Sequence, residues 1–447
     1  MKLDEIVRAC EGELLNGDPQ TEVRSFSTDT RTLQPGALYI PIKGENFDGH
    51  AFITKAFEVG AKASLTSSRE VQGANLIYVA DTKVALQKLA HAVVVKAGVP
   101  VVAVTGSVGK TSTRDMIGAV VASQYRTLKT EGNYNNDIGL PLTILRYRDE
   151  EAMVLEMGMN HLGEIDLLSR IANPDIAVIT NVGTAHIGNL GSRDKILEAK
   201  MEIVNGLKDN GVLIVNQDND KLAWMVEHHG KIAYQIKTFG IHQPALVQAT
   251  EIQLGNDGSH FVYAGVRFDI PVPGEHFILN ALSAIAVGEC LGIPLEKIQQ
   301  ALAHFELTKK RMDFEALPGQ MTLIDGSYNA NLDSMVSSLA VLGQQSGRKI
   351  AVLADMLELG EYSQALHYQA GQACNEAKVD LLITVGKEAQ AILEGASEVK
   401  HKKGFMDNAS ASAFLRENLA PGDVILVKGS NAMHLKEIIN DLKEIKA

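Results

Sequence analysis

The stretch Thr105-Gly106-Ser107-Val108-Gly109-Lys110-Thr111 decides the fold of this chain. It follows the apolar run Val101 to Val104 and opens a helical stretch that extends to Ser123. A continuous apolar run is typical of a strand buried on both faces of a parallel sheet. Glycines let the backbone fold closely around phosphates, and the N–H groups at a helix start point at the anion. The stretch therefore predicts a phosphate-binding loop, in which Lys110 reaches the β- and γ-phosphates and Thr111 holds Mg²⁺.

One position departs from the general pattern of such loops. The pattern asks for a glycine five residues before Gly109, and Val104 stands there. A chance Gly-Lys-Thr turn is the alternative interpretation, but the flanking strand and helix are those that a phosphate loop requires. The loop predicts a nucleotide-binding protein and leaves the reaction open.

Working outward, apolar strand candidates alternate with helical stretches on both sides of the loop, which indicates α/β domains with mostly parallel sheets. In the middle of the chain the strand candidates are Ala152 to Leu155, Ile176 to Thr180 and Val212 to Asn216. Beyond the polar run Thr308 to Arg311 they are Met321 to Ile324, Lys349 to Ala354, Leu381 to Val385 and Val424 to Lys428. The first part of the chain has short candidates at Val23 to Ser27 and Leu38 to Pro41, then a helical stretch from Asp81 to Lys96. We predict three domains: a small N-terminal α/β domain over 1–81, a central P-loop domain over 82–308, and a Rossmann-like domain over 309–447.

Composition limits the classes of function. A chain of 447 residues exceeds one compact core. Its 42 Lys and Arg against 54 Asp and Glu give a net charge of −12, which argues against a nucleic-acid partner. Three separated cysteines without a CxxC suggest neither disulfides nor zinc and fit a reducing compartment. The charged N-terminus and the absence of an apolar run of about 18 residues predict a cytoplasmic protein without membrane insertion. We expect it to be a monomer.

Three further side chains could serve chemistry at the edge of the central sheet. Glu156 ends a strand candidate next to the loop, where a second metal ligand is expected, and a solvated loop charge is the alternative. His186 follows the next strand in a Gly-rich loop, where catalytic groups collect, although such a histidine is usually a surface residue. Lys200 lies fourteen residues later on a helical stretch, and its spacing alone favours a surface lysine.

Together these residues resemble the Mur ligases, which build the peptide of bacterial peptidoglycan precursors. The family loop reads Thr-Gly-(Ser/Thr)-x-Gly-Lys-(Thr/Ser) and commonly lacks the first glycine. The resemblance covers essentially the whole chain. It implies magnesium held by Thr111, Glu156, His186 and a carbamylated Lys200, because a carbamate turns a cation into an anion that can bind metal. It also implies catalytic roles for Lys110, Lys200, His186 and Arg311, of which Arg311 would approach the transferred phosphate.

The resemblance extends to the ATP site. Beyond the loop 105–111, Asn280 matches the family asparagine near adenine, and Asp325 matches the residue that contacts the ribose. The family often has another asparagine where Phe277 stands, and a second aspartate where Gly326 stands. For Arg311, a solvated linker charge is the alternative.

Two N-terminal stretches resemble the uridine-binding motifs of the family members that add the third residue or the final dipeptide. The residues implied in binding the UDP-substrate are Ser27, Asp29, Thr30, Arg31, Lys43, Gly44, Asp48 and His50. Asp and Ser or Thr side chains can bond a uracil or ribose, and Gly with Lys can face a diphosphate. Ordinary turns are an equal alternative for either stretch.

Two later segments resemble the dipeptide-adding member in particular. The first supplies Asn133, Asn135 and Asn136, whose amides suit a peptide-like substrate, and a polar turn is the alternative. The second supplies Tyr328, Asn329 and Asn331. The resemblance thus implies an ATP-dependent ligase that adds D-alanyl-D-alanine to UDP-N-acetylmuramoyl-tripeptide through an acyl phosphate. The alternatives are another Mur-type ligase, a folate polyglutamate ligase, which lacks a uridine domain, and a regulatory P-loop NTPase.

Overall fold

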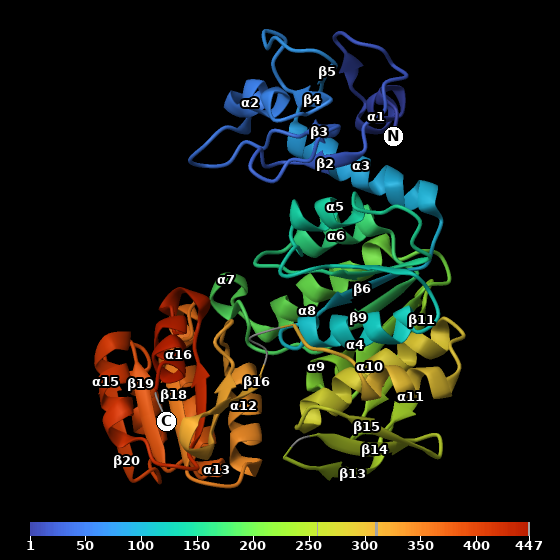
Figure 1. Cartoon of the computed structure of the whole chain (residues 1–447). Helices are drawn as coiled ribbons and strands as arrows, with labels where there is room; N and C mark the ends of the chain where they lie inside the picture. The colour runs from blue at the N-terminus through green and yellow to red at the C-terminus, as the bar shows by residue number, and fades with distance from the viewer. Residues whose placement is uncertain (257, 309–311, 446–447) are drawn as a thin grey trace.

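The apolar run before the phosphate loop forms β6 (Val101–Thr105), in which every residue is buried. The structure is a computed structural model that describes residues 1–256, 258–308 and 312–445. Strand β6 lies inside a seven-stranded parallel sheet of order β12-β11-β10-β9-β6-β8-β7 (Figure 1). The other strands are β7 (Thr127–Lys129), β8 (Ala152–Glu156), β9 (Ile176–Ile179), β10 (Val212–Asn216), β11 (Gln235–Gly240) and β12 (Val247–Gln248).

Helices cover this central sheet and carry the loops at its edge. They are α4 (Lys110–Ala122), α5 (Gly139–Ile144), α6 (Glu164–Ala172), α7 (Ile187–Leu190), α8 (Arg193–Met201), α9 (Asp220–His228), α10 (Glu275–Cys290) and α11 (Leu295–Ala303). Helix α10 packs closely on α4. Both helices pack against the sheet in one buried apolar cluster. This close packing holds α4, and so the loop before it, in a fixed position.

A three-stranded antiparallel sheet, which was not predicted from the sequence, extends the central unit. Its strands are β13 (Thr250–Leu254), β14 (Ser259–Tyr263) and β15 (Val266–Ile270). Only alternate side chains of β15, Phe268 and Ile270, are buried. Phe261 stacks on Phe268 at 5.2 Å between ring centroids. Such half-exposed strands lack the continuous apolar run that marked the parallel strands.

The N-terminal unit is a five-stranded sheet of order β1-β5-β4-β3-β2, in which only the β1–β5 pair is antiparallel. Its strands are β1 (Glu13–Leu14), β2 (Ser25–Ser27), β3 (Ala37–Tyr39), β4 (Ala63–Thr66) and β5 (Leu76–Tyr78), with helices α1 (Leu3–Cys10) and α2 (Ile53–Glu58). Helix α3 (Thr82–Ala97) follows and contacts α1 on one side and α5 and α6 on the other. The side chain of Asp81 caps α3 by accepting hydrogen bonds from the N–H groups of Lys83 and Val84.

The C-terminal unit is a six-stranded sheet of order β16-β17-β21-β18-β19-β20, with only β16–β17 antiparallel. Its strands are β16 (Asp313–Leu317), β17 (Met321–Asp325), β18 (Lys349–Ala354), β19 (Leu381–Val385), β20 (His401–Phe405) and β21 (Val424–Lys428). Its helices are α12 (Leu332–Gln344), α13 (Ser363–Glu376), α14 (Gln390–Gly395), α15 (Asn408–Asn418) and α16 (Lys436–Lys443).

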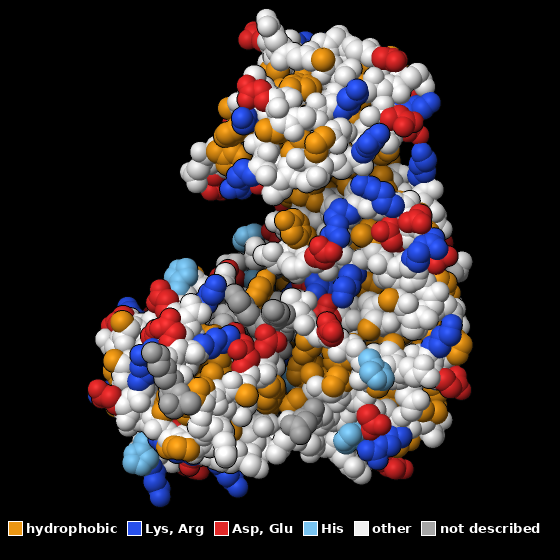
Figure 2. Space-filling model, viewed as in Figure 1, with side chains coloured by type: hydrophobic (Ala, Val, Ile, Leu, Met, Phe, Trp, Pro, Cys, Tyr) orange, Lys and Arg blue, Asp and Glu red, His pale blue; other side chains and the backbone are white. Residues whose placement is uncertain are grey.

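The three α/β units and their mostly parallel sheets confirm the predicted fold class. The domain boundaries at residues 81 and 308 stay predictions, and the polar run 309–311 lies outside the described residues. Figure 2 shows the surface hollowed between the N-terminal and C-terminal units, beside the central unit. In the described part of the chain, no helix combines the length and the apolar character needed to cross a membrane.

Candidate active site

The phosphate loop joins β6 to α4 and is held from the neighbouring strand. The Asn181 side-chain oxygen accepts hydrogen bonds from the backbone N–H groups of Ser107 and Val108, at 3.1 and 2.9 Å. A Cβ at Gly106 would collide with the hydroxyl of Thr180, so only glycine fits there. Lys110 Nζ donates to the carbonyl oxygen of Gly106 at 2.8 Å. The loop therefore presents Lys110 from the first turn of a helix, the arrangement that suits a phosphate.

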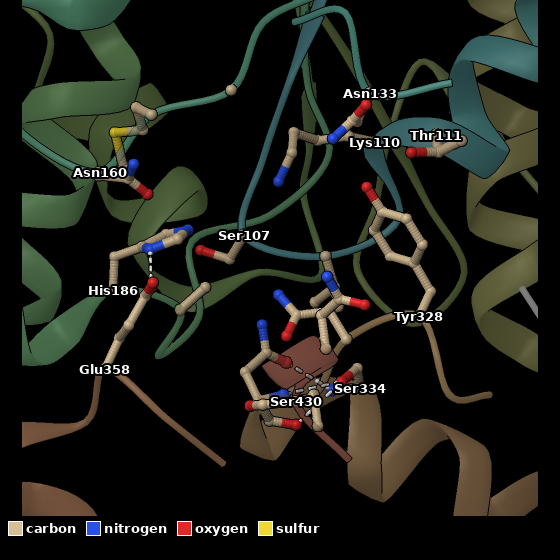
Figure 3. A pocket seen from close by; sticks show the side chains of 18 of the residues that line it. Ser107, Lys110, Thr111, Asn133, Asn160, His186, Tyr328, Ser334, Glu358 and Ser430 are labelled. Atoms are coloured by element: carbon tan, nitrogen blue, oxygen red, sulfur yellow. Dashed lines mark hydrogen bonds and ion pairs between the residues drawn. The ribbon is translucent and has the colours of Figure 1, made fainter. Parts of the chain in front are cut away.

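A cleft of about 480 Å³ lies between this loop and the C-terminal unit (Figure 3). From the central unit it is lined by the loop, by the predicted acceptor-segment residues, and by Glu156 and His186. From the C-terminal unit it is lined by the segment after β17 and by two further loops. The structure thus brings together these predicted residues, which are far apart in sequence: Ser107, Val108, Gly109, Lys110, Thr111, Asn133, Asn135, Asn136, Glu156, His186, Tyr328, Asn329 and Asn331.

A smaller pocket, of about 130 Å³, opens on the other side of the loop. Asn280 lines it together with Phe277 and His276. Burial, and to a lesser extent the neighbouring Lys428, lowers the pKa of His276 to about 4. Asp325, at the end of β17, is buried and accepts hydrogen bonds from the backbone N–H and hydroxyl of Ser327 at 2.9 and 2.7 Å. An apolar pocket with amides beside a phosphate loop is suited to a nucleotide base.

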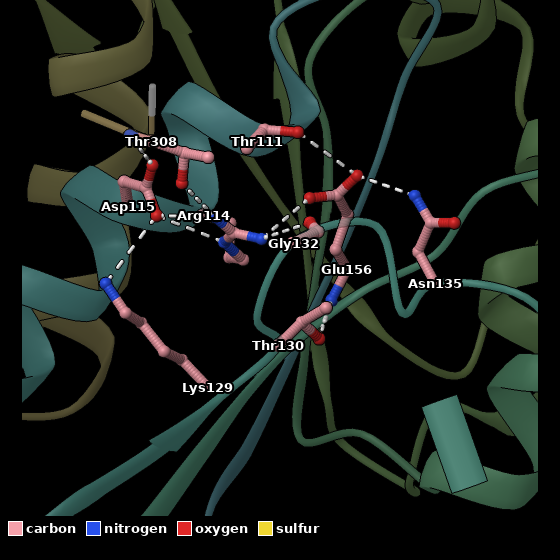
Figure 4. Close-up of polar contacts among 9 residues, drawn as sticks. All are labelled: Thr111, Arg114, Asp115, Lys129, Thr130, Gly132, Asn135, Glu156 and Thr308. Carbon is pink, nitrogen blue, oxygen red and sulfur yellow. Dashed lines mark hydrogen bonds and ion pairs between the residues drawn. The ribbon is translucent and has the colours of Figure 1, made fainter. Parts of the chain in front are cut away.

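Glu156 is buried at the end of β8, with 2% of its surface exposed, which excludes a solvated loop charge. Thr111 donates its hydroxyl to the Glu156 carboxylate at 3.3 Å, and Asn135 donates its amide to the same oxygen at 2.8 Å (Figure 4). Glu156 and Thr111 therefore meet beneath the phosphate loop. Carboxylate and hydroxyl oxygens there are the ligands that Mg²⁺ prefers when it also keeps waters and phosphate oxygens.

Arg114, which was not predicted from the sequence, is almost fully buried behind this site. Its guanidinium donates to the Glu156 carboxylate at 3.3 Å and to Asp115 at 2.6 Å (Figure 4). It also donates to the carbonyl of Gly132 at 3.1 Å and to the hydroxyl of Thr308 at 2.8 Å. One side chain thus ties Glu156 to the asparagine loop and to the end of the central unit. The adjacent Arg-Asp pair in α4 was the available sequence signal.

His186 lines the same cleft, and Lys200 lies outside its described lining. His186 precedes α7 with a positive φ of 61°, and its Nδ1 lies 2.7 Å from a Glu358 carboxylate oxygen. Burial and the nearby Lys110 lower the pKa of His186. Lys200 is 1% exposed, so the surface interpretation is wrong, and burial lowers its pKa well below the ordinary value. Within the described ranges, no three His, Cys, Asp or Glu side chains form a group able to hold a metal.

Several predicted residues have structural partners of their own. Asn331 caps α12 by accepting from the N–H of Ser334 at 2.9 Å. Asn136 accepts from the N–H of Gly139 at 2.7 Å and so fixes the start of α5. Arg311 lies outside the described residues.

The N-terminal residues predicted to bind a UDP group lie outside both the cleft and the pocket. They belong to the unit at the top of Figure 1. There Arg31 pairs with Asp29 at 2.6 Å and His50 pairs with Asp48 at 2.6 Å. His50 Nε2 also accepts from the backbone N–H of Ser67 at 3.1 Å. These side chains order their own turns in this arrangement.

Comparisons with known proteins point to one family. Three family models match: the Mur ligase middle domain over residues 104–288, the Mur ligase glutamate ligase domain over 310–431, and the Mur ligase family catalytic domain over 22–115. The UDP-N-acetylmuramoyl-tripeptide--D-alanyl-D-alanine ligase of Bacillus subtilis is 41% identical over 98% of this chain and 97% of its own. The Escherichia coli enzyme of the same name is 36% identical over 97% of each.

Solved structures agree with these sequence relatives. A crystal structure of MurF from Acinetobacter baumannii superposes with a TM-score of 0.93 at 35% identity and covers 99% of both chains. The MurF ligase of Thermotoga maritima in complex with ADP superposes with a TM-score of 0.84 at 28% identity, over 94% of this chain and 97% of its own.

Proposed function

This chain belongs to the Mur ligase family, and on that basis we propose that it joins D-alanyl-D-alanine to UDP-N-acetylmuramoyl-tripeptide while ATP is cleaved to ADP and phosphate. The observation that carries the proposal is the cleft, in which the phosphate loop faces the 328–331 segment of the C-terminal unit. Relatives named for this reaction match along nearly the whole chain. The reaction is a step of peptidoglycan precursor synthesis.

The chemistry needs an activated carboxylate. A free carboxylate is a poor acyl donor, so the tripeptide carboxylate first attacks the γ-phosphorus and ADP leaves, which gives an acyl phosphate. The amine of the dipeptide then attacks the acyl carbon, a C–N bond forms, and phosphate leaves. Attacking carboxylate and γ-phosphate are both anionic, so neutralisation of charge dominates the barrier. Lys110, in the phosphate loop, is placed to supply it, and Arg311 is proposed as a second cation.

We assign Mg²⁺ to Thr111, Glu156, His186 and a carbamylated Lys200. The contact of Thr111 with Glu156 at 3.3 Å supports one ion at the loop. The lowered pKa of buried Lys200 supports the carbamate, because the neutral amine is the form that reacts with carbon dioxide. Bound Mg²⁺ would neutralise phosphate charge and polarise the γ-phosphoryl group. The residues that line the cleft would orient the reacting groups around the bound Mg²⁺.

The substrates are assigned to three regions. We propose that the adenine binds in the pocket of Asn280, with its ribose toward Asp325 at the end of β17. The ADP complex of the Thermotoga relative supports the binding of an adenine nucleotide. The uridine group is placed on the N-terminal unit at Ser27, Asp29, Thr30, Arg31, Lys43, Gly44, Asp48 and His50. The growing peptide and the dipeptide are placed in the cleft at Asn133, Asn135, Asn136, Tyr328, Asn329 and Asn331.

We also propose that the enzyme acts as a monomer in the cytoplasm. Both faces of the cleft come from this one chain, which supports a monomer. Free thiols at Cys10, Cys290 and Cys374 support a reducing compartment.

Phosphate release from ATP tests the function directly. It is measured with UDP-N-acetylmuramoyl-tripeptide and D-alanyl-D-alanine, each alone and both together. We expect release to require both substrates. Release that needs neither would favour a regulatory NTPase, and release that needs the UDP-substrate with another amine would keep the family and discard this dipeptide.

A further inference from the structure

Glu358 adopts a backbone conformation that a residue with a side chain rarely takes. Its φ is 63°, in the left-handed region. The loop before it is held firmly: the N–H of Met356 donates to His367 Nε2 at 2.9 Å, and the N–H of Leu357 donates to the Ser430 hydroxyl at 2.9 Å. Strained residues persist where the surroundings over-determine them, and they cluster at ligand sites. The loop therefore fixes the backbone position from which the Glu358 side chain extends.

That carboxylate lies in the cleft, on the side opposite the phosphate loop (Figure 3). Its side chain is 53% exposed and contacts His186 of the central unit. Two other acids line the cleft among the described residues. Glu156 is buried among Thr111, Arg114 and Asn135, and Glu164 accepts from the N–H of Asn160 at 2.7 Å at the start of α6. Both of these acids belong to the central unit. Among the described residues that line the cleft, Glu358 is the acid from the C-terminal unit.

The amine substrate brings a positive charge into this cleft. Its α-amino group is an ammonium in solution near neutral pH, and it must approach the acyl carbon next to the phosphate loop. Lys110 and Lys428, which also line the cleft, would repel it. An accessible carboxylate across from the phosphate loop would attract the ammonium and offset its repulsion by these lysines.

We propose that Glu358 binds the α-ammonium group of the incoming amine substrate and so positions its nitrogen beside the acyl carbon. The ammonium then gives up a proton, and the free amine attacks. This inference rests on the proposed function, because it takes the amine as the ligand of the C-terminal wall. The ammonium replaces His186 as the partner of the carboxylate, so one charge-assisted contact is exchanged for another. Ser430 and Asn431, which line the same wall, offer a hydroxyl and an amide to the rest of the dipeptide.

The test compares two ligands that differ only in the ammonium: D-alanyl-D-alanine, and its analogue with an α-hydroxyl in place of the amine. Calorimetry measures their binding to the full-length chain loaded with UDP-N-acetylmuramoyl-tripeptide and a non-hydrolysable ATP analogue. We expect the wild type to favour the dipeptide by about 10- to 100-fold, the usual worth of a hydrogen bond to a charged group. Glu358→Gln should bring that ratio close to 1, and Glu358→Asp should restore part of it.

Glu361→Gln is the matched control, because Glu361 is exposed on the same loop and does not belong to the described lining of the cleft. It should keep the wild-type ratio. A purely structural role for Glu358 would weaken both ligands equally and leave the ratio unchanged in Glu358→Gln, which would overturn the proposal. If the wild type ligates a different amine, the proposed function fails instead. The same ratio, measured with that amine and its hydroxy analogue, then decides the role of Glu358.

Discussion

At the scale of single residues, burial changes the chemistry of Lys200, whose side chain is 1% exposed. An uncompensated ammonium in the interior is costly, so burial holds the pKa of Lys200 well below its ordinary value. Conversion to a carbamate would turn the Lys200 side chain into an anionic metal ligand. Lys200→Ala removes this ligand and should therefore lower the rate of ligation by orders of magnitude. Bicarbonate or a short carboxylic acid, which can fill the vacated space with a carboxylate, should restore part of the phosphate release.

Lys195→Ala provides the control for this substitution. Lys195 lies on the same helix, is exposed, and pairs with Glu198 at 2.6 Å. Its loss should leave ligation near the wild-type rate, since exposed ion pairs contribute little. Full activity of the Lys200→Ala variant would rule out the carbamate.

The lowered pKa of His276 leads us to expect that the stability of the folded chain depends on pH. Its pKa is lowered to about 4 in the folded chain, against an ordinary value of 6.5. Between these values the unfolded chain binds a proton that the folded chain does not, so this histidine makes stability fall as pH drops from 6.5 toward 4. His276→Gln should flatten that part of the curve of melting temperature against pH. His304→Gln, at an exposed site, should not, and an identical slope in the His276→Gln variant and the wild type would contradict the assignment.

At the scale of elements, the sequence predicted the strands that read as continuous apolar runs. It missed β4, which is also buried throughout, because Ser64 and Thr66 interrupt any apolar run there. β6 and β8 are buried throughout, so their apolar runs were visible without tertiary information. The hairpins of β13 to β15 bury few residues, and their pattern was not recognised. The phosphate loop was predictable because its chemistry is contiguous. The contact of His186 with Glu358 spans 172 residues of sequence, and only the fold brings such partners together.

The same contact region contains a glycine that the packing of two elements requires. The N–H of Gly188, in α7, donates to the carbonyl of Glu358 at 3.1 Å. A Cβ at Gly188 would lie 2.6 Å from that carbonyl oxygen and 2.7 Å from the backbone nitrogen of Gly360. Because both obstacles are backbone, Gly188→Ala should push the C-terminal loop away from the phosphate loop.

We expect Gly188→Ala to reduce ligation by about 100-fold, the cost that a displacement of about 1 Å can impose on reacting groups. Steady-state phosphate release measures this, and the melting temperature should change little. Gly230→Ala is the control, since a Cβ there meets nothing within 4 Å. A Gly188→Ala variant as active as this control would mean that the loop contact is dispensable.

At the scale of the whole molecule, the predicted substrate residues lie on separate units. The predicted uridine motifs belong to the N-terminal unit (Figure 1). The cleft lies between the central and C-terminal units. A single UDP-linked substrate must bridge them, and its acyl phosphate would hydrolyse if water reached it. Both requirements are met if the units close around bound substrates, which also strengthens every charge interaction inside.

Small-angle scattering measures this closure. With a non-hydrolysable ATP analogue and UDP-N-acetylmuramoyl-tripeptide together, the radius of gyration should fall below that of the free chain. Either ligand alone occupies fewer of the surfaces that must meet, so each should produce a smaller change. Dimensions that stay constant with both ligands bound would mean that the hollow between the units is already the reacting geometry. In that case water would have to be excluded by the substrates themselves.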